Sequence, residues 1–183
     1  MIHTNLKFLF FFIAWGFCQL AFGQSSARHS ICLVIPEIAI LDLEPNNTAI
    51  NLSLNPPTES GTALTLSKED ASKWLNYTSA IAPNGASRSI AAQISGNSIP
   101  EGLQLYLEAG NYSGSGGGTL GKSTGKMALD TSPKTIISDI GRSYTGNGTN
   151  NGHQLKYSLS IADYGKLNAE TNQQVMVIFT ITE

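Results

Sequence analysis

Short runs in which apolar and polar residues alternate recur along this chain of 183 residues, and clusters of Gly, Pro, Asn and Ser separate them. The clearest run is "HQLKYSLSI", where Leu155, Tyr157, Leu159 and Ile161 take every second position. Because successive side chains of a β-strand point to opposite faces, such a run forms a strand with one apolar face and one polar face. Several such strands bury their apolar faces against each other, so we expect an all-β fold with antiparallel sheets.

Further runs bring the expected number of strands to about nine. Three of them alternate clearly, at residues 49–55, 103–109 and 173–183. Five are weaker, at residues 31–43, 73–81, 87–94, 126–130 and 134–140. Many short strands with turn residues between them are typical of an antiparallel β-sandwich. The one candidate helix is a single turn around residues 67–74, with Ser67 as its cap and Asp70 at the third helical position.

Proline and glycine predict further details of these strands. Pro36 lacks a backbone N–H and interrupts its run, so this strand is expected at a sheet edge or with a bulge. Asn84-Gly85 predicts a hairpin turn that needs positive φ. The final run, residues 173–183, carries apolar residues on both faces, including Met176 and Ile178, which predicts a central strand or one covered on both sides.

The N-terminal sequence predicts a secretory signal peptide over residues 1–23. Lys7 precedes an apolar run from Phe8 to Phe17, and small residues ending with Gly23 follow. The run is shorter than the roughly 20 residues that a membrane-spanning helix needs. Cleavage after Gly23 would leave one domain, residues 24–183, with no membrane span. We therefore expect a secreted protein of the periplasm or the cell surface.

Cysteine content and charge narrow the classes of protein further. Cys32 alone remains after signal removal, so an intramolecular disulfide is excluded, which fits a bacterial cell envelope better than animal secretion. The apolar neighbours of Cys32 predict a buried, inert thiol, and an intermolecular bridge is the alternative. The formal net charge is −2 and no basic patch is present, so nucleic acid is not an expected partner.

Residues Gly116 to Ser123, "GGGTLGKS", match the G-x-x-x-x-G-K-[ST] pattern of phosphate-binding loops. Such a loop binds phosphate because it runs from a buried parallel strand directly into a helix. Here an alternating strand precedes it, and Gly125 and Pro133 leave no room for a useful helix. We therefore expect no nucleotide partner, and we predict a surface loop from Gly110 to Gly125 with Lys122 exposed.

Other catalytic and metal-binding patterns are missing from the sequence. A metal site needs three or four convergent ligands, and no spacing of His, Cys, Asp or Glu proposes one. No G-x-S-x-G motif marks a serine nucleophile. His153 follows a glycine-rich loop and is predicted to be solvated. We expect no catalytic, cofactor-binding or metal-binding residues, and hence no enzyme and no cofactor.

Tyrosines near glycine-rich and asparagine-rich loops are the candidates for a ligand-binding surface. Tyr106 is expected to face outward from its strand, while Tyr112, Tyr144 and Tyr164 lie in or beside loops. An exposed ring can stack on the apolar face of a sugar while neighbouring amides bond to its hydroxyl groups. The alternative is that these rings cover the ends of the sandwich and keep their hydroxyl groups in water.

The C-terminal part of the chain resembles a known type of secreted bacterial domain. Leu155 to Thr182 read "LKYSLSIADYGKLNAETNQQVMVIFTIT", a tyrosine-bearing strand, a short polar connection and a last strand rich in Val, Ile and Thr. This ending is similar to that of the pilin-like and spore-coat-U-like β-sandwiches. The resemblance implies an antiparallel immunoglobulin-like β-sandwich of about 8–9 strands without catalysis. The paired cysteines common in such subunits are missing here.

These features predict a non-enzymatic structural or adhesive, pilin-like surface subunit, and a carbohydrate-binding module of the cell surface is the alternative. Subunits of the pilin-like kind polymerise when an N-terminal extension of one copy completes the sheet of the next. Ile31 to Leu43 is apolar enough for such a donor strand, or it forms the domain's own first strand. Other copies, other envelope proteins and glycans are therefore the expected partners.

Overall fold

The chain forms two compact units, which divide between Val34 and Ile35. The computed structural model describes residues 25–169 and 173–182, and the predicted signal peptide, residues 1–23, lies outside the described residues. The described part of the second unit consists of antiparallel sheets and one 3₁₀ turn, η1 (Tyr164–Lys166), which confirms the expected all-β class. No helix within the described ranges is long and apolar enough to span a membrane.

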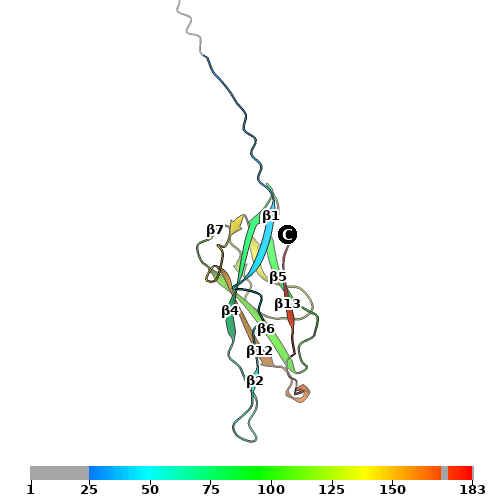
Figure 1. Cartoon of the computed structure of the whole chain (residues 1–183). Helices are drawn as coiled ribbons and strands as arrows, with labels where there is room; N and C mark the ends of the chain where they lie inside the picture. The colour runs from blue at the N-terminus through cyan, green and yellow to red at the C-terminus, as the bar shows by residue number, and fades with distance from the viewer. Residues whose placement is uncertain (1–24, 170–172, 183) are drawn as a thin grey trace, which may run out of the picture. The chain divides into compact units, whose positions relative to one another are not determined.

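The larger sheet contains seven strands. They are β1 (Ile38–Glu44), β4 (Asp70–Ala80), β6 (Leu103–Ser113), β7 (Gly117–Gly118), β9 (Lys126–Ala128), β11 (Ser143–Tyr144) and β12 (Gly152–Ile161). The strand order is β7-β11-β4-β12-β6-β9, with every pairing antiparallel. Figure 1 labels β1, β4, β6, β7 and β12 of this sheet. β1 pairs with the other side of β4, since Thr78 lies opposite Ile40 in β1 and opposite Tyr144 in β11.

The second sheet contains four strands, and a short ribbon completes the fold. The sheet comprises β5 (Arg88–Ser95), β8 (Lys122–Ser123), β10 (Lys134–Ile140) and β13 (Met176–Thr182), in the order β13-β5-β10-β8. The ribbon pairs β2 (Leu54–Asn55) with β3 (Thr65–Leu66). The chain passes from the larger sheet to the smaller one between β4 and β5 and returns between β5 and β6.

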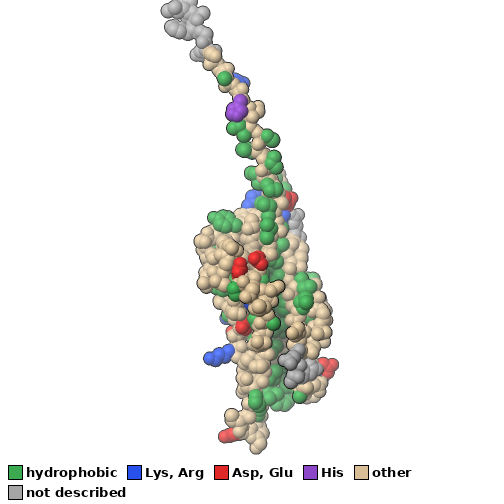
Figure 2. All heavy atoms as spheres, viewed as in Figure 1, with side chains coloured by type: hydrophobic (Ala, Val, Ile, Leu, Met, Phe, Trp, Pro, Cys, Tyr) green, Lys and Arg blue, Asp and Glu red, His purple; other side chains and the backbone are tan. Residues whose placement is uncertain are grey.

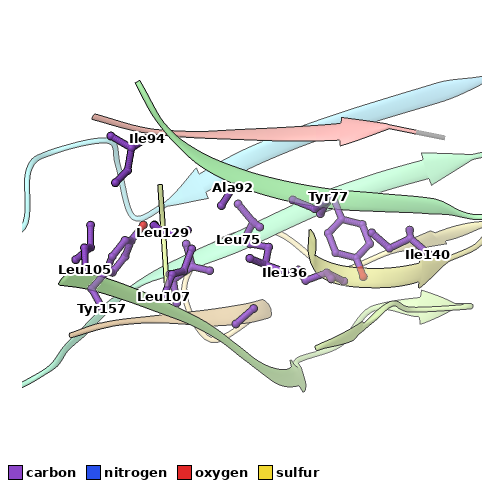
Figure 3. Close-up of a cluster of buried hydrophobic side chains, with 14 residues drawn as sticks. Leu75, Tyr77, Ala92, Ile94, Leu105, Leu107, Leu129, Ile136, Ile140 and Tyr157 are labelled. Atoms are coloured by element: carbon purple, nitrogen blue, oxygen red, sulfur yellow. The ribbon is translucent and has the colours of Figure 1, made fainter. Parts of the chain in front are cut away.

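Both larger sheets contribute side chains to one core. The buried residues include Leu75 and Tyr77 of β4, Ile90, Ala92 and Ile94 of β5, Leu105 and Leu107 of β6, Ile136 and Ile140 of β10, and Leu155 and Tyr157 of β12. Figure 3 shows these side chains meeting between the strands of the two sheets. Burial of each large aliphatic side chain contributes about 1.5–3 kcal/mol, so the apolar faces of the alternating strands supply the main stabilisation.

The predicted helical turn at residues 67–74 is wrong, because most of this segment belongs to β4, which begins at Asp70. Ser67 does not cap a helix. Its hydroxyl accepts a hydrogen bond from the N–H of Ser53 at 3.0 Å, and its own N–H donates to the Ser53 carbonyl at 2.7 Å. The core-facing side chains at alternate positions of residues 75–79 require an extended chain, and this long-range packing prevails over the local capping pattern.

Residues 49–55 form less of a strand than their alternation predicts. Ile50 and Leu52 do pack against the core while their neighbours are exposed, but only Leu54 and Asn55 pair with another strand. Pro56 follows immediately and cannot donate to a ladder, which helps to end the pairing there. The alternation therefore predicted which side chains of residues 49–55 point to the core, but not which of these residues pair with another strand.

The prediction of a buried Cys32 is wrong. Cys32 is exposed and lies in the described part of the first unit, residues 25–34, which contains neither helix nor strand. The regular strand begins only at Ile38, after Pro36. β1 pairs with β4 alone among the described strands, so the expectation of an edge strand near this proline is confirmed.

The last strand is not central, contrary to the prediction. β13 pairs only with β5 within the described residues and is an edge strand of the smaller sheet. Its outward residues Met176 and Ile178 are 64% and 37% exposed. Asn84 does take the positive φ expected for its turn, 65°, but this turn joins β4 to β5 in different sheets and is therefore not a hairpin.

Arg88 and Lys73 hold the two ends of β1 against the rest of its own chain. Each is 5% exposed. The Arg88 guanidinium donates to the carbonyl of Ile38 and to the carboxylate of Glu37, the latter at 2.7 Å. The Lys73 ammonium donates to the carbonyl of Asn46 at 2.9 Å, just beyond the end of the strand. A buried cation is tolerated when its donors are satisfied, and here each satisfied donor also fixes the path of β1.

Replacing Arg88 should loosen β1. Arg88→Met keeps much of the apolar stem but removes the donors to Ile38 and Glu37, and we expect it to lower the free energy of unfolding by about 2–3 kcal/mol. Lys134→Met is the matched control, because Lys134 pairs with Asp130 on an exposed surface, where such pairs contribute at most about 1 kcal/mol. Urea unfolding measures both variants, and equal losses would contradict the role given to Arg88.

Candidate functional site

The glycine-rich stretch Gly116 to Ser123 carries the chain from one sheet to the other. Its first part contains β7, which pairs with β11 in the larger sheet, and its last part contains β8, which pairs with β10 in the smaller sheet. The prediction of one surface loop from Gly110 to Gly125 is therefore wrong in part, because β6, β7 and β8 occupy much of it. Lys122 is exposed as expected, with its ammonium 3.5 Å from the carboxylate of Asp139.

Partners within the protein already engage several backbone N–H groups of this stretch. The N–H of Thr119 donates to the carbonyl of Arg142 at 3.0 Å, and the N–H of Gly121 donates to the hydroxyl of Tyr77 at 2.9 Å. The N–H of Gly116 donates to the hydroxyl of Tyr112. Residues 110–140, all described, contain no helix to complete a phosphate cradle. The motif here serves as a crossing between sheets.

His153 is the largest departure from the sequence-based expectation. It was predicted to be solvated, and it is 0% exposed. Its Nδ1 lies 2.8 Å from the carbonyl of Gly110, and its Nε2 lies 3.3 Å from the hydroxyl of Tyr77. Since a carbonyl accepts only, Nδ1 carries the proton and Nε2 accepts from Tyr77. The Tyr77 hydroxyl thus donates to His153 and accepts from Gly121.

Burial sets the protonation of this pair. Desolvation lowers the pKa of His153, and the bond to the Gly110 carbonyl opposes this shift. Desolvation raises the pKa of Tyr77, and the bond from the Gly121 N–H opposes it. Both groups are therefore neutral near pH 7, which is the state that the three hydrogen bonds require. The two rings also stack, with centroids 5.8 Å apart.

The four candidate tyrosines do not form one surface. Tyr106 is half-buried on β6, and the ammonium of Lys126 lies 5.1 Å from its ring centroid. Tyr112 is also half-buried, and its hydroxyl donates to the carbonyl of Thr145 at 3.2 Å. Tyr144 on β11 and Tyr164 in η1 are 55% and 53% exposed. Of the four, only Tyr144 lines the smaller hollow that is described below, and Tyr164 is not among the residues of that hollow.

A contiguous apolar segment is exposed in front of β1. Ile31, Leu33, Val34 and Ile35 are each 71–87% exposed, and Cys32 is exposed as well. Figure 2 shows hydrophobic side chains along this segment. Single apolar residues are normal on protein surfaces, whereas five exposed in succession are unusual.

An apolar groove of about 700 Å³ lies between β6 and β12 of the larger sheet and the β13 side of the smaller one. The residues that define it are mainly aliphatic and include Leu52, Ile99, Leu103, Leu159, Val175 and Val177. Asn51, Glu101 and Gln173 contribute polar groups, and the lining residues within the described ranges include no cationic side chain. Figure 2 shows hydrophobic side chains in the recess along the lower half of the second unit.

Sequence reasoning missed this groove, although residues 49–55 carried its signal. An alternating run that fails to pair leaves apolar side chains incompletely covered, and Ile50, Leu52 and Leu54 all line the groove. Among the described residues no cluster of His, Cys, Asp or Glu could hold a metal ion.

No protein-family model, no curated protein and no solved structure matches the chain.

Stability should fall below neutral pH because of His153. Its pKa is lowered on folding, so below about pH 6.5, the ordinary value for histidine, the unfolded state binds more protons than the folded state. The free energy of unfolding should therefore drop as pH falls from 6.5 towards the folded pKa, by at most about 1.4 kcal/mol per pH unit. Urea unfolding between pH 7.5 and 5.5 measures this slope.

The slope should become shallower in His153→Gln and remain in His29→Gln, because His29 is exposed in the first unit. Loss of His153 also removes the acceptor for Tyr77, so this variant should be less stable at every pH. An unchanged slope in His153→Gln would show that other groups bind the protons.

Two adjacent positions of the crossing should respond very differently to alanine. A Cβ atom at Gly121 would overlap Ile137 and lie 2.6 Å from Ile140 and 2.9 Å from the carbonyl of Ser138. We expect Gly121→Ala to cost about 1–3 kcal/mol, as overpacked cores do. Lys122→Ala removes only an exposed pair and should stay within about 0.5 kcal/mol of wild type. Thermal and urea unfolding compare them, and a disruptive Lys122→Ala would point to a role beyond the surface.

Proposed function

We propose that this protein is a non-enzymatic, exported structural or adhesive subunit in which the apolar segment Ile31 to Ile35 of one copy packs against another copy. The observation that carries the proposal is the exposure of this segment, 71–87% at its four large aliphatic residues. Leaving this much apolar surface in water is costly, at about 25 cal/mol per Å², and association removes the cost. The predicted signal peptide supports export, and the all-β fold supports an immunoglobulin-like sandwich.

The alternation of the segment suits strand addition. In an extended conformation Ile31, Leu33 and Ile35 lie on one face, while Cys32 and Val34 lie on the other. An added strand obtains main-chain hydrogen bonds from an open edge and specificity from alternate side chains that enter pockets. We take β13 as the receiving edge, since it pairs with β5 alone among the described strands, while β1 lies near it without pairing.

The apolar groove is the proposed receiving surface. Val175 and Val177 bring one wall of the groove to the start of β13, beside the open edge. Leu103 and Leu159 form part of the opposite wall, and no lysine, arginine or histidine among the lining residues opposes an aliphatic ligand. A strand paired with β13 of a second copy would direct Ile31, Leu33 and Ile35 into this groove. The groove volume of about 700 Å³ lies within the range of well-formed ligand sites.

Association should depend on the face of the segment that carries Ile31, Leu33 and Ile35. The chain without residues 1–23 should form oligomers that grow with protein concentration in light scattering, in the presence of a reductant that prevents disulfides at Cys32. The triple variant Ile31→Ser, Leu33→Ser, Ile35→Ser should remain a monomer. The matched control, Cys32→Ser with Val34→Ser, alters the other face and should still associate.

A peptide experiment separates donor from acceptor. A fluorescent peptide of residues 25–36 should bind saturably to the chain that lacks residues 1–35, and the peptide with the three serines should not bind. A monomeric wild-type chain at all concentrations, together with no peptide binding, would refute the proposal. Equal association of the two segment variants would refute the assigned face.

A further inference from the structure

A second, smaller hollow lies on the outer face of the larger sheet. Its volume is about 310 Å³, and β1, β4, β11 and the turn after β11 line it. Thr78 stands at its centre, with Ile40 opposite on one side and Tyr144 opposite on the other. The next row of the sheet adds Asp42, which pairs with Asn76. Leu41 and Leu43, on either side of Asp42, pack on the core, so the side chains at 40 and 42 project outward.

Two exposed apolar surfaces flank the hollow. They are the side chain of Ile40, a residue that is 60% exposed, and the ring of Tyr144, a residue that is 55% exposed. No ring stack and no hydroxyl hydrogen bond joins Tyr144 to another described residue, in contrast to Tyr112, whose hydroxyl bonds to Thr145 and Gly116. A rigid aromatic side chain offers a large contact area at a small cost in conformational entropy. Such a ring suits a ligand that has a flat apolar face.

The polar groups of the hollow include both donors and acceptors. Thr78 contributes a hydroxyl, Asn147 an exposed amide, and Asp42 a carboxylate of which one oxygen accepts from the N–H of Leu43 at 2.8 Å. Among the described residues that line it there is no lysine, arginine or histidine, and Asp42 is the one charged side chain. An anionic ligand would meet only negative charge here. Groups of this kind match the hydroxyls of a neutral polyhydroxylated ligand.

A buried asparagine forms part of the floor of the hollow. Asn76 is 4% exposed, and its Nδ2 donates to the carbonyl of Gly148 at 3.0 Å. Its Oδ1 is buried without a hydrogen-bond partner among the described residues. Because this oxygen is closed to solvent and lies beside Gly152, Asn76 supports the floor of the hollow and is not counted among the groups that bond to a ligand.

The turn that forms one wall is fixed before any ligand binds. Asn151 donates from Nδ2 to the carbonyl of Asn147 at 2.8 Å, and the N–H of Thr145 donates to the carbonyl of Tyr77 at 3.0 Å. Gly146 has a φ of 87°, and a Cβ atom there would lie 2.7 Å from Oδ1 of Asn151, so no side chain fits. A wall held in place in this way reduces the entropy that binding must overcome.

We propose that this hollow is a binding site for a neutral saccharide, with a sugar ring stacked on Tyr144 and its hydroxyl groups bonded to Asp42, Thr78 and Asn147. The exposed aromatic ring selects the apolar face of a pyranose, and the mixed donors and acceptors select its hydroxyls. The lack of a cationic lining residue selects against acidic sugars. The site is independent of the apolar groove, with which it shares no lining residue.

An array of neutral and acidic oligosaccharides tests the proposal with the chain lacking residues 1–23. Titration calorimetry then measures the affinity of each neutral oligosaccharide that gives a signal. Wild type should bind at least one neutral oligosaccharide saturably, and Tyr144→Ala should weaken that binding by tenfold or more. Asp42→Asn should weaken it by a smaller factor. Tyr164→Ala is the matched control, because Tyr164 is equally exposed but outside the hollow, and it should bind as wild type does.

Three results would overturn the proposal: no saturable signal from any neutral oligosaccharide, binding restricted to acidic sugars, or equal binding by Tyr144→Ala and wild type. Unchanged thermal unfolding of Tyr144→Ala shows that a loss of binding is local. The triple variant of Ile31, Leu33 and Ile35 separates the two proposals, because it should remain a monomer and still bind the saccharide.

Discussion

The hydroxyl of Tyr77 connects the interior of the larger sheet to the crossing that leads into the smaller one. It donates to Nε2 of His153 on β12 and accepts from the N–H of Gly121, which immediately precedes β8. In water each of these groups would have other partners, but in the core a missing partner costs about 1–3 kcal/mol. The pairing therefore fixes the crossing relative to β4 and β12, and the neutral state of His153 is a condition for it.

The glycines of the crossing follow from the same constraint. Gly121 approaches Ile137 and Ile140 so closely that a Cβ atom would overlap them, and Gly118, with a φ of 91°, lies against the backbone of Arg142 and Ser143. Glycine is needed where a backbone must pass this near to another, and here several such positions fall together. The glycines of the phosphate-loop pattern are thus explained by close packing between the sheets. Glycine allows a loop to approach phosphate closely, and it equally allows one backbone to pass close to another.

The sequence predicted the strands well where alternation and pairing coincide, as in β6 and β12, because a period of two has one structural meaning there. It failed where the deciding contact comes from far along the chain. His153 was predicted to be solvated because a glycine-rich loop precedes it. It is buried because β4 and β6 pair on either side of β12 in the folded sheet. β13 looks central because both faces are apolar, and only the strand order places it at an edge. Of the tyrosines, Tyr144 faces the hollow for a reason that local sequence does not contain, the register of β11 against Thr78.

β1 shows how one short strand can serve several tasks at once. Leu41 and Leu43 enter the core, Ile40 and Asp42 line the outer hollow, and the exposed segment Ile31 to Ile35 precedes it. The shallow hollow of about 310 Å³ would bind a single sugar unit weakly, since few atoms can be in contact at once. Association through the apolar segment would place many such sites on one assembly. Linked sites rebind at a high effective concentration, so an assembly gains avidity that no single copy has. The two proposals therefore reinforce each other physically, because weak sugar binding would be more useful on an assembly than on a single copy.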